Sequence, residues 1–443
     1  MSPLVHRSRP IIRRAGLGLA VLAAAVMSWA PASAAGAEEN VVIRGGKIFT
    51  MTRGVIDGGL VLIRDGRIAA VGKNIPIPKG ARLIDAAGGA VCPGLIDAFT
   101  NLGTTQAGSL GADSDEATSP VTPQLRIIDA LDPENDFIRL ARQSGVTAAL
   151  VAPGEGNLLS GQSALLRLAG DGVEEMIVRF PVGVHGSLGE LVKLRYGQKN
   201  QMPSTRMGEA ALLRQTLIEA QSYMEKLHRY EKNLADYQAK AKEEKATISD
   251  KPEPPAKNFK LLALIPLLTG KQPWIVRANR LDDILTVLRL AEEFHLTVIL
   301  NHGAAAWKVA DRLAARNIPV LVGPASADFQ LEETREARPD LAARLRQAGV
   351  KIAFQTGSTR NVTDLLSQAQ AAVVAGLPRE EALKALTLYP AQIFGVADQL
   401  GSLEAGKIAD VVIFDGEPLT RPVRVKMVLL AGKTVVPQSE GSK

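Results

Sequence analysis

Histidine is the side chain of this sequence best suited to binding a metal or moving a proton near neutral pH. Four of the five histidines in the 443-residue chain follow residue 34: His185, His228, His295 and His302. We expect solvent-exposed or structural roles for His228, which lies in a charged stretch, and for His295, which precedes an apolar run. His185 and His302 stand where apolar runs end, so they are candidate metal ligands. Two imidazoles are nevertheless fewer than the three or four protein ligands of a zinc site.

The composition excludes several classes of protein. Hydrophobic residues make up 46% of the chain and charged residues 22%, which predicts a large buried core and argues against a disordered chain. Aromatic residues make up only 4%, and no run of Lys or Arg is interleaved with them, so we expect no nucleic-acid partner. Cys92 is the only cysteine, which rules out an internal disulfide.

The first 34 residues have the features of a cleaved signal peptide. Four arginines precede or open an apolar run over residues 15–29, and the small residues Ala32-Ser33-Ala34 form a cleavage signal. A retained membrane anchor is the alternative, but the run is shorter than the ~20 residues of a spanning helix. The pair Arg13-Arg14 makes export by a twin-arginine signal an alternative route. We therefore predict a periplasmic or secreted protein without a stable membrane anchor, and the leader carries four of the six net positive charges.

Eight apolar runs predict the elements that position the candidate site. They lie near residues 90–96, 145–152, 163–169, 177–184, 273–278, 297–302, 318–323 and 350–355, and helical patterns such as 281–293, 304–315 and 341–348 separate most of them. Buried parallel strands that alternate with helices eight times indicate a (β/α)8 TIM-type barrel over residues 87–399. Any chemistry should then lie at the carboxyl ends of the strands.

Both ends of the chain predict a second, smaller domain. Residues 38–86 and 400–437 contain short apolar strands separated by Gly and Asp turns, which is typical of antiparallel hairpins. We expect the two segments to combine into one composite β-sandwich domain.

A helical insertion over residues 204–256 interrupts the predicted barrel. The stretch 209–245 is rich in Ala, Leu, Glu, Lys and Gln, and the proline-rich stretch 252–255 ends it. An apolar stripe runs along it, and Tyr223, Tyr230 and Tyr237 repeat every seven residues. The stripe either packs against the chain's own barrel or contacts another subunit or partner. Such a helix would be over 50 Å long at about 1.5 Å per residue, so we expect part of it to project and support an oligomer.

Several motifs resemble the amidohydrolase superfamily, in particular its imidazolonepropionase-like branch. They are Val91-Cys92-Pro93-Gly94-Leu95-Ile96-Asp97, Ala382-Leu383-Lys384-Ala385-Leu386-Thr387 and Gly401-Ser402-Leu403-Glu404-Ala405-Gly406-Lys407, together with shorter matches such as Gly145-Val146-Thr147. The resemblance covers nearly all of the chain after the leader. It implies a barrel with a composite β domain and hydrolysis of amide or cyclic-amide C–N bonds with zinc or another divalent metal.

The residues at the family's metal-ligand positions depart from its pattern. By this resemblance Phe99 and Asn101 replace the two histidines of the first strand, His185 replaces the fourth-strand lysine, and Arg277 replaces the fifth-strand histidine. His302 keeps the sixth-strand histidine, and Gly357 replaces the eighth-strand aspartate. We therefore expect no metal cofactor and no catalytic residue, with Phe99, Asn101, Arg277 and Gly357 lining a ligand site.

These departures predict a metal-free pseudoenzyme that binds a small ligand or supports an active paralogue as a homo-oligomer or hetero-oligomer. Arg277 could grip an anionic ligand such as a carboxylate, or it could only neutralise an acidic neighbour. The alternative function is hydrolysis of non-peptide C–N bonds by an altered active site.

Overall fold

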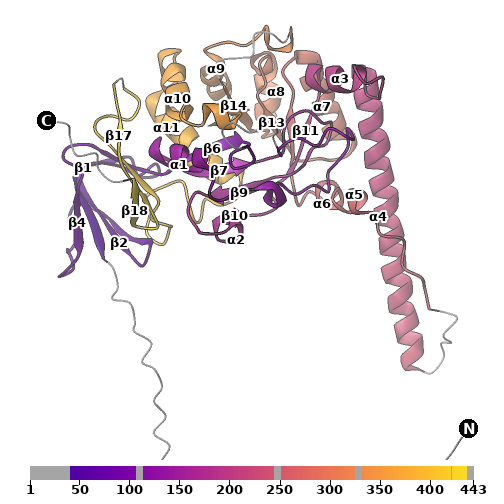
Figure 1. Cartoon of the computed structure of the whole chain (residues 1–443), viewed down its shortest axis with the longest axis horizontal. Coiled ribbons are helices and arrows are strands. Elements are labelled where there is room, and N and C mark those ends of the chain that lie inside the picture. Colours follow the sequence, from indigo (N-terminus) through magenta and orange to yellow (C-terminus); the bar gives the residue numbers. More distant parts are fainter. Residues whose placement is uncertain (1–39, 106–112, 244–250, 325–331, 421, 437–443) are drawn as a thin grey trace, which may run out of the picture. The chain divides into compact units, whose positions relative to one another are not determined.

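The computed structural model describes residues 40–105, 113–243, 251–324, 332–420 and 422–436 (Figure 1). The predicted signal peptide lies outside these residues. No helix within the described ranges combines the length and the apolar character that crossing a membrane requires.

Seven parallel strands form the framework of the barrel. They are β6 (Leu95–Thr100), β7 (Val146–Val151), β11 (Val184–Ser187), β12 (Trp274–Arg277), β13 (Val298–Asn301), β14 (Val320–Val322) and β15 (Ile352–Phe354). Two parallel ladders run through them, one joining β6 to β7 and the other running from β11 to β15 in chain order. The two ladders meet where the Gly357 backbone N–H, just after β15, donates a hydrogen bond of 3.0 Å to the Phe99 carbonyl of β6.

One barrel position differs from the predicted eight parallel strands. The predicted strand 163–169 is β9 (Ala164–Arg167), which runs antiparallel to β7, and β8 (Gly161–Gln162) just before it runs antiparallel to β11. The predicted strand 177–184 is two strands, because β10 (Ile177–Arg179) pairs antiparallel with β9 and β11 begins only at Val184. The long connection between parallel neighbours usually contains a helix, and no helix lies between β7 and β9. The prediction of eight parallel strands was therefore wrong at this position.

Strands from both chain ends form a second sheet. Its members are β1 (Val41–Phe49), β2 (Val55–Arg64), β3 (Arg67–Gly72), β4 (Arg82–Asp85), β5 (Ala90–Pro93), β16 (Val411–Phe414), β17 (Val425–Leu430) and β18 (Lys433–Val436). β5 pairs antiparallel with β16 and so joins the two ends. All eight strands belong to one hydrogen-bonded sheet rather than to the two sheets of the predicted sandwich. A register irregularity between Ile43 and Lys47 in β1 lets its first half pair with β4 and its second half with β5.

Gly94 marks the passage from this sheet into the barrel. It separates β5 from β6, which together correspond to the single predicted strand 90–96. A Cβ atom on Gly94 would overlap the side chain of Thr147 on β7. The chain therefore passes so close to β7 that only glycine fits there.

Helices accompany the barrel strands. They are α1 (Asp136–Gln143), α2 (Val173–Met176), α3 (Glu190–Gly197), α5 (Phe259–Leu262), α6 (Ile265–Leu268), α7 (Leu281–Glu293), α8 (Ala310–Ala315), α9 (Leu341–Gln347), α10 (Leu365–Val374), α11 (Arg379–Leu386) and α12 (Leu388–Ile393), with short 3-10 turns η1 (Ile127–Ala130), η3 (Ala306–Val309), η4 (Glu332–Thr334) and η5 (Thr359–Asn361). α7 has the predicted bounds because Ile284, Val287, Leu288 and Ala291 recur at helical spacing and are all buried.

The insertion forms one helix, α4 (Arg206–Lys242), of 37 residues. Thr205 caps the start of this helix, because its hydroxyl accepts a hydrogen bond of 3.0 Å from the Gly208 backbone N–H. Its first half contacts α5, α6 and α7 and buries Leu213, Leu217 and Tyr223 among others. No residue of α4 after Tyr223 is buried, and the helix extends past the labels of α5 and α6 in Figure 1. The first half of α4 thus packs against the chain itself, which was one of the two predicted alternatives.

Candidate functional site

Four elements bring the candidate residues to the carboxyl ends of the barrel strands. Arg277 is the last residue of β12, His302 follows β13, and Gly357 follows β15. Phe99 belongs to β6 and is buried. Two acidic residues that the sequence analysis did not identify join them: Glu155 from the loop after β7 and Glu333 from η4.

Arg277 is the centre of an ion-pair network. Its Nε lies 3.3 Å from Glu155 Oε2, and its terminal nitrogen forms a short ion pair with Glu333 Oε1. The side chains of Arg277 and Glu333 are 6% and 0% exposed, so both charges are removed from water. Two carboxylates therefore share one guanidinium. This arrangement matches the alternative in which Arg277 neutralises acidic neighbours.

Each carboxylate of the network has further hydrogen-bond donors. Glu155 Oε1 accepts a bond of 2.7 Å from Asn301 Nδ2 and lies 2.9 Å from His302 Nε2. Glu333 accepts bonds from the Glu190 backbone N–H at 2.7 Å and from Asn279 Nδ2 at 3.4 Å. Burial alone would raise the pKa of Glu155, but His302, Arg277 and His185 together hold that pKa below its ordinary value. Glu155 is therefore ionised at neutral pH.

The carboxylate of Glu155 decides which ring nitrogen of His302 donates to it. A carboxylate can only accept a hydrogen bond, so we assign the imidazole proton to Nε2. No described residue bonds Nδ1 of His302, and that atom is not closed off from solvent. His302 therefore bonds Glu155 through Nε2 and leaves Nδ1 without a described partner.

Phe99 contacts both histidines of the predicted metal pair. Its ring stacks on His185 with centroids 5.6 Å apart and meets His302 edge-on at 6.4 Å. His185 Nε2 is buried without a hydrogen-bond partner, and burial lowers the pKa of His185 to about 3, although Glu155 opposes that shift. His185 is therefore a neutral, apolar-packed side chain.

The residues present do not fit the metal that the family resemblance implies. Within the described part of the chain, no group of three or more His, Cys, Asp or Glu could hold a metal ion. Phe99 has no lone pair to donate. We therefore derive no chemistry from a bound metal.

Asn101 and Gly357 stabilise or shape the backbone at the ends of β6 and β15. Asn101 Oδ1 accepts hydrogen bonds from the Thr359 backbone N–H at 2.8 Å and from its hydroxyl at 2.9 Å, which ties the end of β6 to η5. Gly357 has a φ of +74°, and a Cβ atom there would lie 2.8 Å from Pro324 Cδ. A carboxylate side chain at position 357 would need Pro324 to shift.

A cavity of about 590 Å³ opens beside the network. Glu155, Arg277, Asn279 and His302 line its polar end. Its other walls come mainly from β14, β15, α9 and α10. The apolar residues Val322, Leu341, Ala342, Phe354 and Ala372 line them, together with Arg338 and polar residues such as Gln368. Gly357 also lines the cavity, whereas Phe99, Asn101 and His185 do not.

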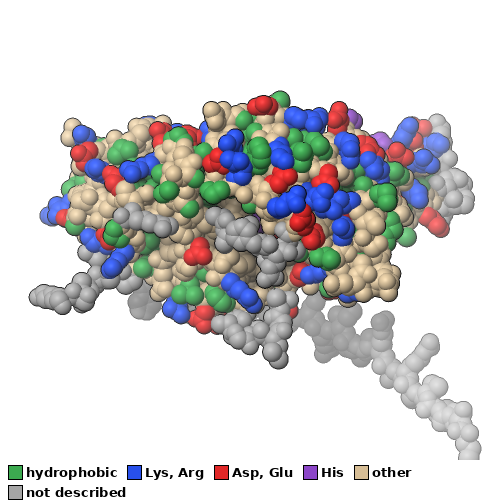
Figure 2. Space-filling view, turned by 90° about the horizontal axis from the view of Figure 1, so that it is seen from above, with side chains coloured by type: hydrophobic (Ala, Val, Ile, Leu, Met, Phe, Trp, Pro, Cys, Tyr) green, Lys and Arg blue, Asp and Glu red, His purple; other side chains and the backbone are tan. Residues whose placement is uncertain are grey.

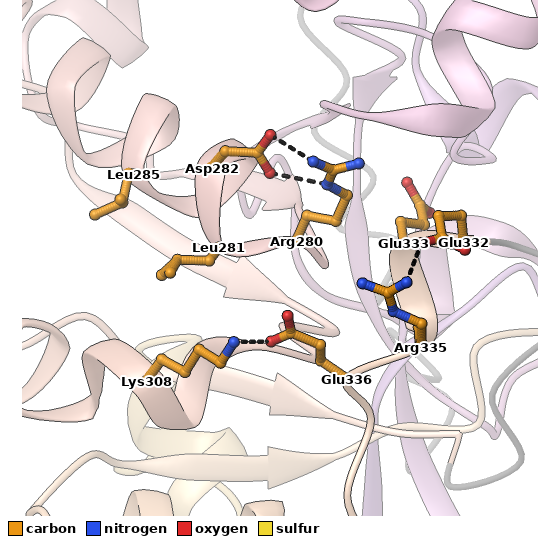
Figure 3. Close-up of a pocket in the computed structure, with 9 residues that line it drawn as sticks. All are labelled: Arg280, Leu281, Asp282, Leu285, Lys308, Glu332, Glu333, Arg335 and Glu336. Carbon is orange, nitrogen blue, oxygen red and sulfur yellow. Dashed lines mark hydrogen bonds and ion pairs between the residues drawn. The ribbon is translucent and has the colours of Figure 1, made fainter.

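A second pocket of about 340 Å³ lies on another side of Glu333. Figure 3 shows that its charged side chains pair with one another: Arg280 with Asp282, Lys308 with Glu336 and Arg335 with Glu332. Basic and acidic side chains are likewise mixed over the face seen in Figure 2. The second pocket is smaller than the cavity beside Arg277, and none of the site residues that the sequence predicted lines it, so it is the weaker candidate.

A buried acid lies beneath the site on β6. The Asp97 carboxylate accepts hydrogen bonds from the Thr356 backbone N–H at 3.0 Å and from the Thr356 hydroxyl at 2.5 Å. Burial raises the pKa of Asp97 to about 7, although these hydrogen bonds oppose the shift. Asp97 therefore links β6 to the end of β15, and its ionisation affects stability near neutral pH.

Comparisons with known proteins agree with the fold and the motifs. The amidohydrolase family model matches residues 275–435. A crystal structure of an amidohydrolase from Thermotoga maritima superposes with a TM-score of 0.81 at 32% identity, covering 90% of this chain and 100% of that one. The amidohydrolase tasK of Hapsidospora irregularis is 25% identical over 83% of this chain, which spans only 39% of that protein. An imidazolonepropionase of Aromatoleum aromaticum is 25% identical over 82% of this chain and 86% of its own length. The chain belongs to the amidohydrolase family.

Proposed function

We propose that this protein is a metal-independent member of the family that binds a small ligand in the cavity beside Arg277 and does not hydrolyse it. The observation that carries the proposal is the pairing of Arg277 with both Glu155 and Glu333. A guanidinium that holds two carboxylates at the position of a family metal ligand supports the loss of the metal. The cavity with its polar end and apolar walls supports the retention of ligand binding.

Elemental analysis of the protein purified without added metal tests this proposal. We expect far less than one zinc or other divalent ion per chain, before and after dialysis against a chelator. A tightly held ion close to one per chain would overturn the proposal.

Hydrolysis of non-peptide C–N bonds is the second candidate, and one observation favours it. Glu155 lies 2.9 Å from His302 Nε2 and both residues line the cavity, and a carboxylate–imidazole pair of this kind can act as a general base. The test measures hydrolysis of cyclic amides in the presence of a chelator. Activity that survives the chelator and is lost in His302→Phe would favour the hydrolase over the binding protein.

We also propose that the second half of α4 contacts another subunit, either a further copy or an active homologue. Leu227, Tyr230, Leu234 and Tyr237 keep the stripe along this half, and each is only half-buried in the single chain. Light scattering of the purified protein at micromolar concentration tests this contact.

Export of the chain is a separate proposal, which the leader motif over residues 1–34 supports. Periplasmic fractionation followed by N-terminal sequencing of the mature protein tests it. A chain that keeps its first residues and stays in the cytoplasm would contradict it.

A further inference from the structure

A third cavity, of about 320 Å³, lies between the second sheet and α11. The turn between β1 and β2 forms one of its walls, α11 forms another, and residues 417–420, which follow β16, form the third. It shares no lining residue with the cavity beside Arg277. It is therefore separate from the site described above.

The walls of this third cavity are mainly apolar. The apolar residues that line it are Phe49, Met51, Val55, Leu383, Pro418 and Leu419. The side chain of Val55 is 54% exposed, so hydrocarbon of this wall is in contact with water. A ligand with an apolar body would remove that surface from water, which favours binding.

Hydrogen bonds fix the turn that forms the first wall. The backbone N–H and the hydroxyl of the buried Thr50 donate to the Gly54 carbonyl at 3.1 and 2.8 Å, and the Thr50 hydroxyl accepts from the Arg53 backbone N–H at 2.9 Å. Within this turn Met51 has a φ of +71°, which side chains other than glycine rarely adopt. The hydrogen bonds of Thr50 offset that strain, so Met51 is held in the wall before a ligand binds.

The charged residues of the third cavity favour a negatively charged head group. Both acids that line it already have a cation, because Glu417 lies 3.0 Å from Lys47 and Glu380 lies 2.6 Å from Lys384. Arg379 also lines the cavity, and its side chain has no ion-pair or hydrogen-bond partner among the described residues. A guanidinium can bind a carboxylate through two parallel N–H donors. A cationic head group would instead compete with the two lysines.

We propose that the third cavity binds a small aliphatic carboxylate, whose head group pairs with Arg379 and whose hydrocarbon tail lies against Met51, Val55 and Leu419. This site is independent of the proposed function, because it uses no residue of the cavity beside Arg277.

The methyl group of Met51 gives a readout confined to this site. None of the residues that line the cavity beside Arg277 is a methionine, and Met51→Leu identifies the Met51 signal among those of the eight methionines. NMR titration of the protein with isotope-labelled methionine methyl groups compares hexanoate, butanoate and hexylamine.

The titration is run at about pH 7, where the carboxylates and the amine are all ionised. We expect hexanoate to shift the Met51 signal and to bind about tenfold more tightly than butanoate, since each buried CH₂ group contributes about fourfold. Hexylamine should bind about tenfold more weakly than hexanoate, because it offers no acceptor to the guanidinium.

Matched variants locate the head group and the tail. Arg379→Met should weaken hexanoate about tenfold, a typical loss for one hydrogen bond to a charged group, and Arg379→Lys should keep part of the affinity. Arg360→Met removes an exposed arginine outside the cavity and should change nothing. Val55→Trp should fill part of the cavity and weaken all three probes, whereas Ile77→Trp, at a position that is 45% exposed and outside it, should weaken none.

Two results would overturn the carboxylate site. One is a Met51 signal that hexanoate does not shift, or shifts with the same affinity in Arg379→Met as in the wild type. The other is hexylamine that binds as tightly as hexanoate. Circular dichroism of each variant verifies that it is folded. Because the readout involves neither Arg277 nor a metal, either result would leave the proposed function standing.

Discussion

Replacing Arg277 by methionine is the sharpest test of the ion-pair network. The substitution keeps most of the side-chain volume but leaves Glu155 and Glu333 without their shared cation. Glu333 is 0% exposed, so water cannot replace the lost partner. Removing one partner of a buried pair costs about 3–5 kcal/mol, because the remaining charge is buried and uncompensated. We therefore expect Arg277→Met to lower the free energy of unfolding by about that amount.

Urea unfolding followed by circular dichroism measures this loss, and two further variants interpret it. Arg280→Met breaks the ion pair between Arg280 and Asp282, whose side chains are 42% and 51% exposed. It should lower the free energy of unfolding by less than about 1 kcal/mol. Glu333→Gln combined with Arg277→Met removes one of the stranded charges and should recover part of the loss. An Arg277→Met variant that is no less stable than Arg280→Met would refute the argument that the network is buried and internally neutralised.

Three further predictions follow from the same geometry. Burial raises the pKa of Asp97 to about 7. The stability that the protonated carboxyl contributes is therefore complete below its unfolded pKa near 4 and is lost as the pH rises through 7. Relative to Asp97→Asn, the free energy of unfolding of the wild type should fall by about 2–3 kcal/mol between pH 5 and pH 7.5 in urea unfolding, and a constant difference would contradict the buried acid. Gly357→Asp should lower the free energy of unfolding by about 1–3 kcal/mol, because φ is +74° and the new Cβ meets Pro324. It should not create a zinc site, and a fully stable variant that binds one zinc per chain would contradict this prediction. Replacing Tyr230 and Tyr237 by Glu should convert an oligomer into a folded monomer in light scattering, and an unchanged oligomer would place the contact elsewhere.

Elements with a strong local pattern were predictable from the sequence. The bounds of α7 agree with the prediction because its buried residues recur at helical spacing over thirteen positions. α4 begins at Arg206 rather than at residue 209, since Thr205 caps it three residues earlier than composition alone indicated. The positions of the strands were also largely predicted, but their directions were not. An apolar run of four residues has the same pattern in either direction. Only the absence of a helix between β7 and β9 indicates in advance that β9 runs antiparallel to β7.

The sequence likewise identified some residues of the candidate site and missed others. Resemblance to the family identified Arg277, His302 and Gly357, because each follows or ends a strand whose flanking motif is recognisable. It could not identify Glu155 or Glu333, which come from a loop and a 3-10 turn outside those motifs. Asn101 was assigned to the ligand site, yet its amide holds Thr359, because the loop after β15 folds back over the end of β6.

The sequence by itself determined that four of the positions aligned with metal ligands hold Phe99, Asn101, Arg277 and Gly357, since residue identity decides whether a lone pair or a carboxylate is available at all. Only the tertiary structure decided what the charge of Arg277 does. Electrostatic interactions depend on distances between groups far apart in the chain, and here residues 155 and 333 meet at residue 277. That meeting pairs the Arg277 cation with two carboxylates, so its charge is not free for an anionic ligand.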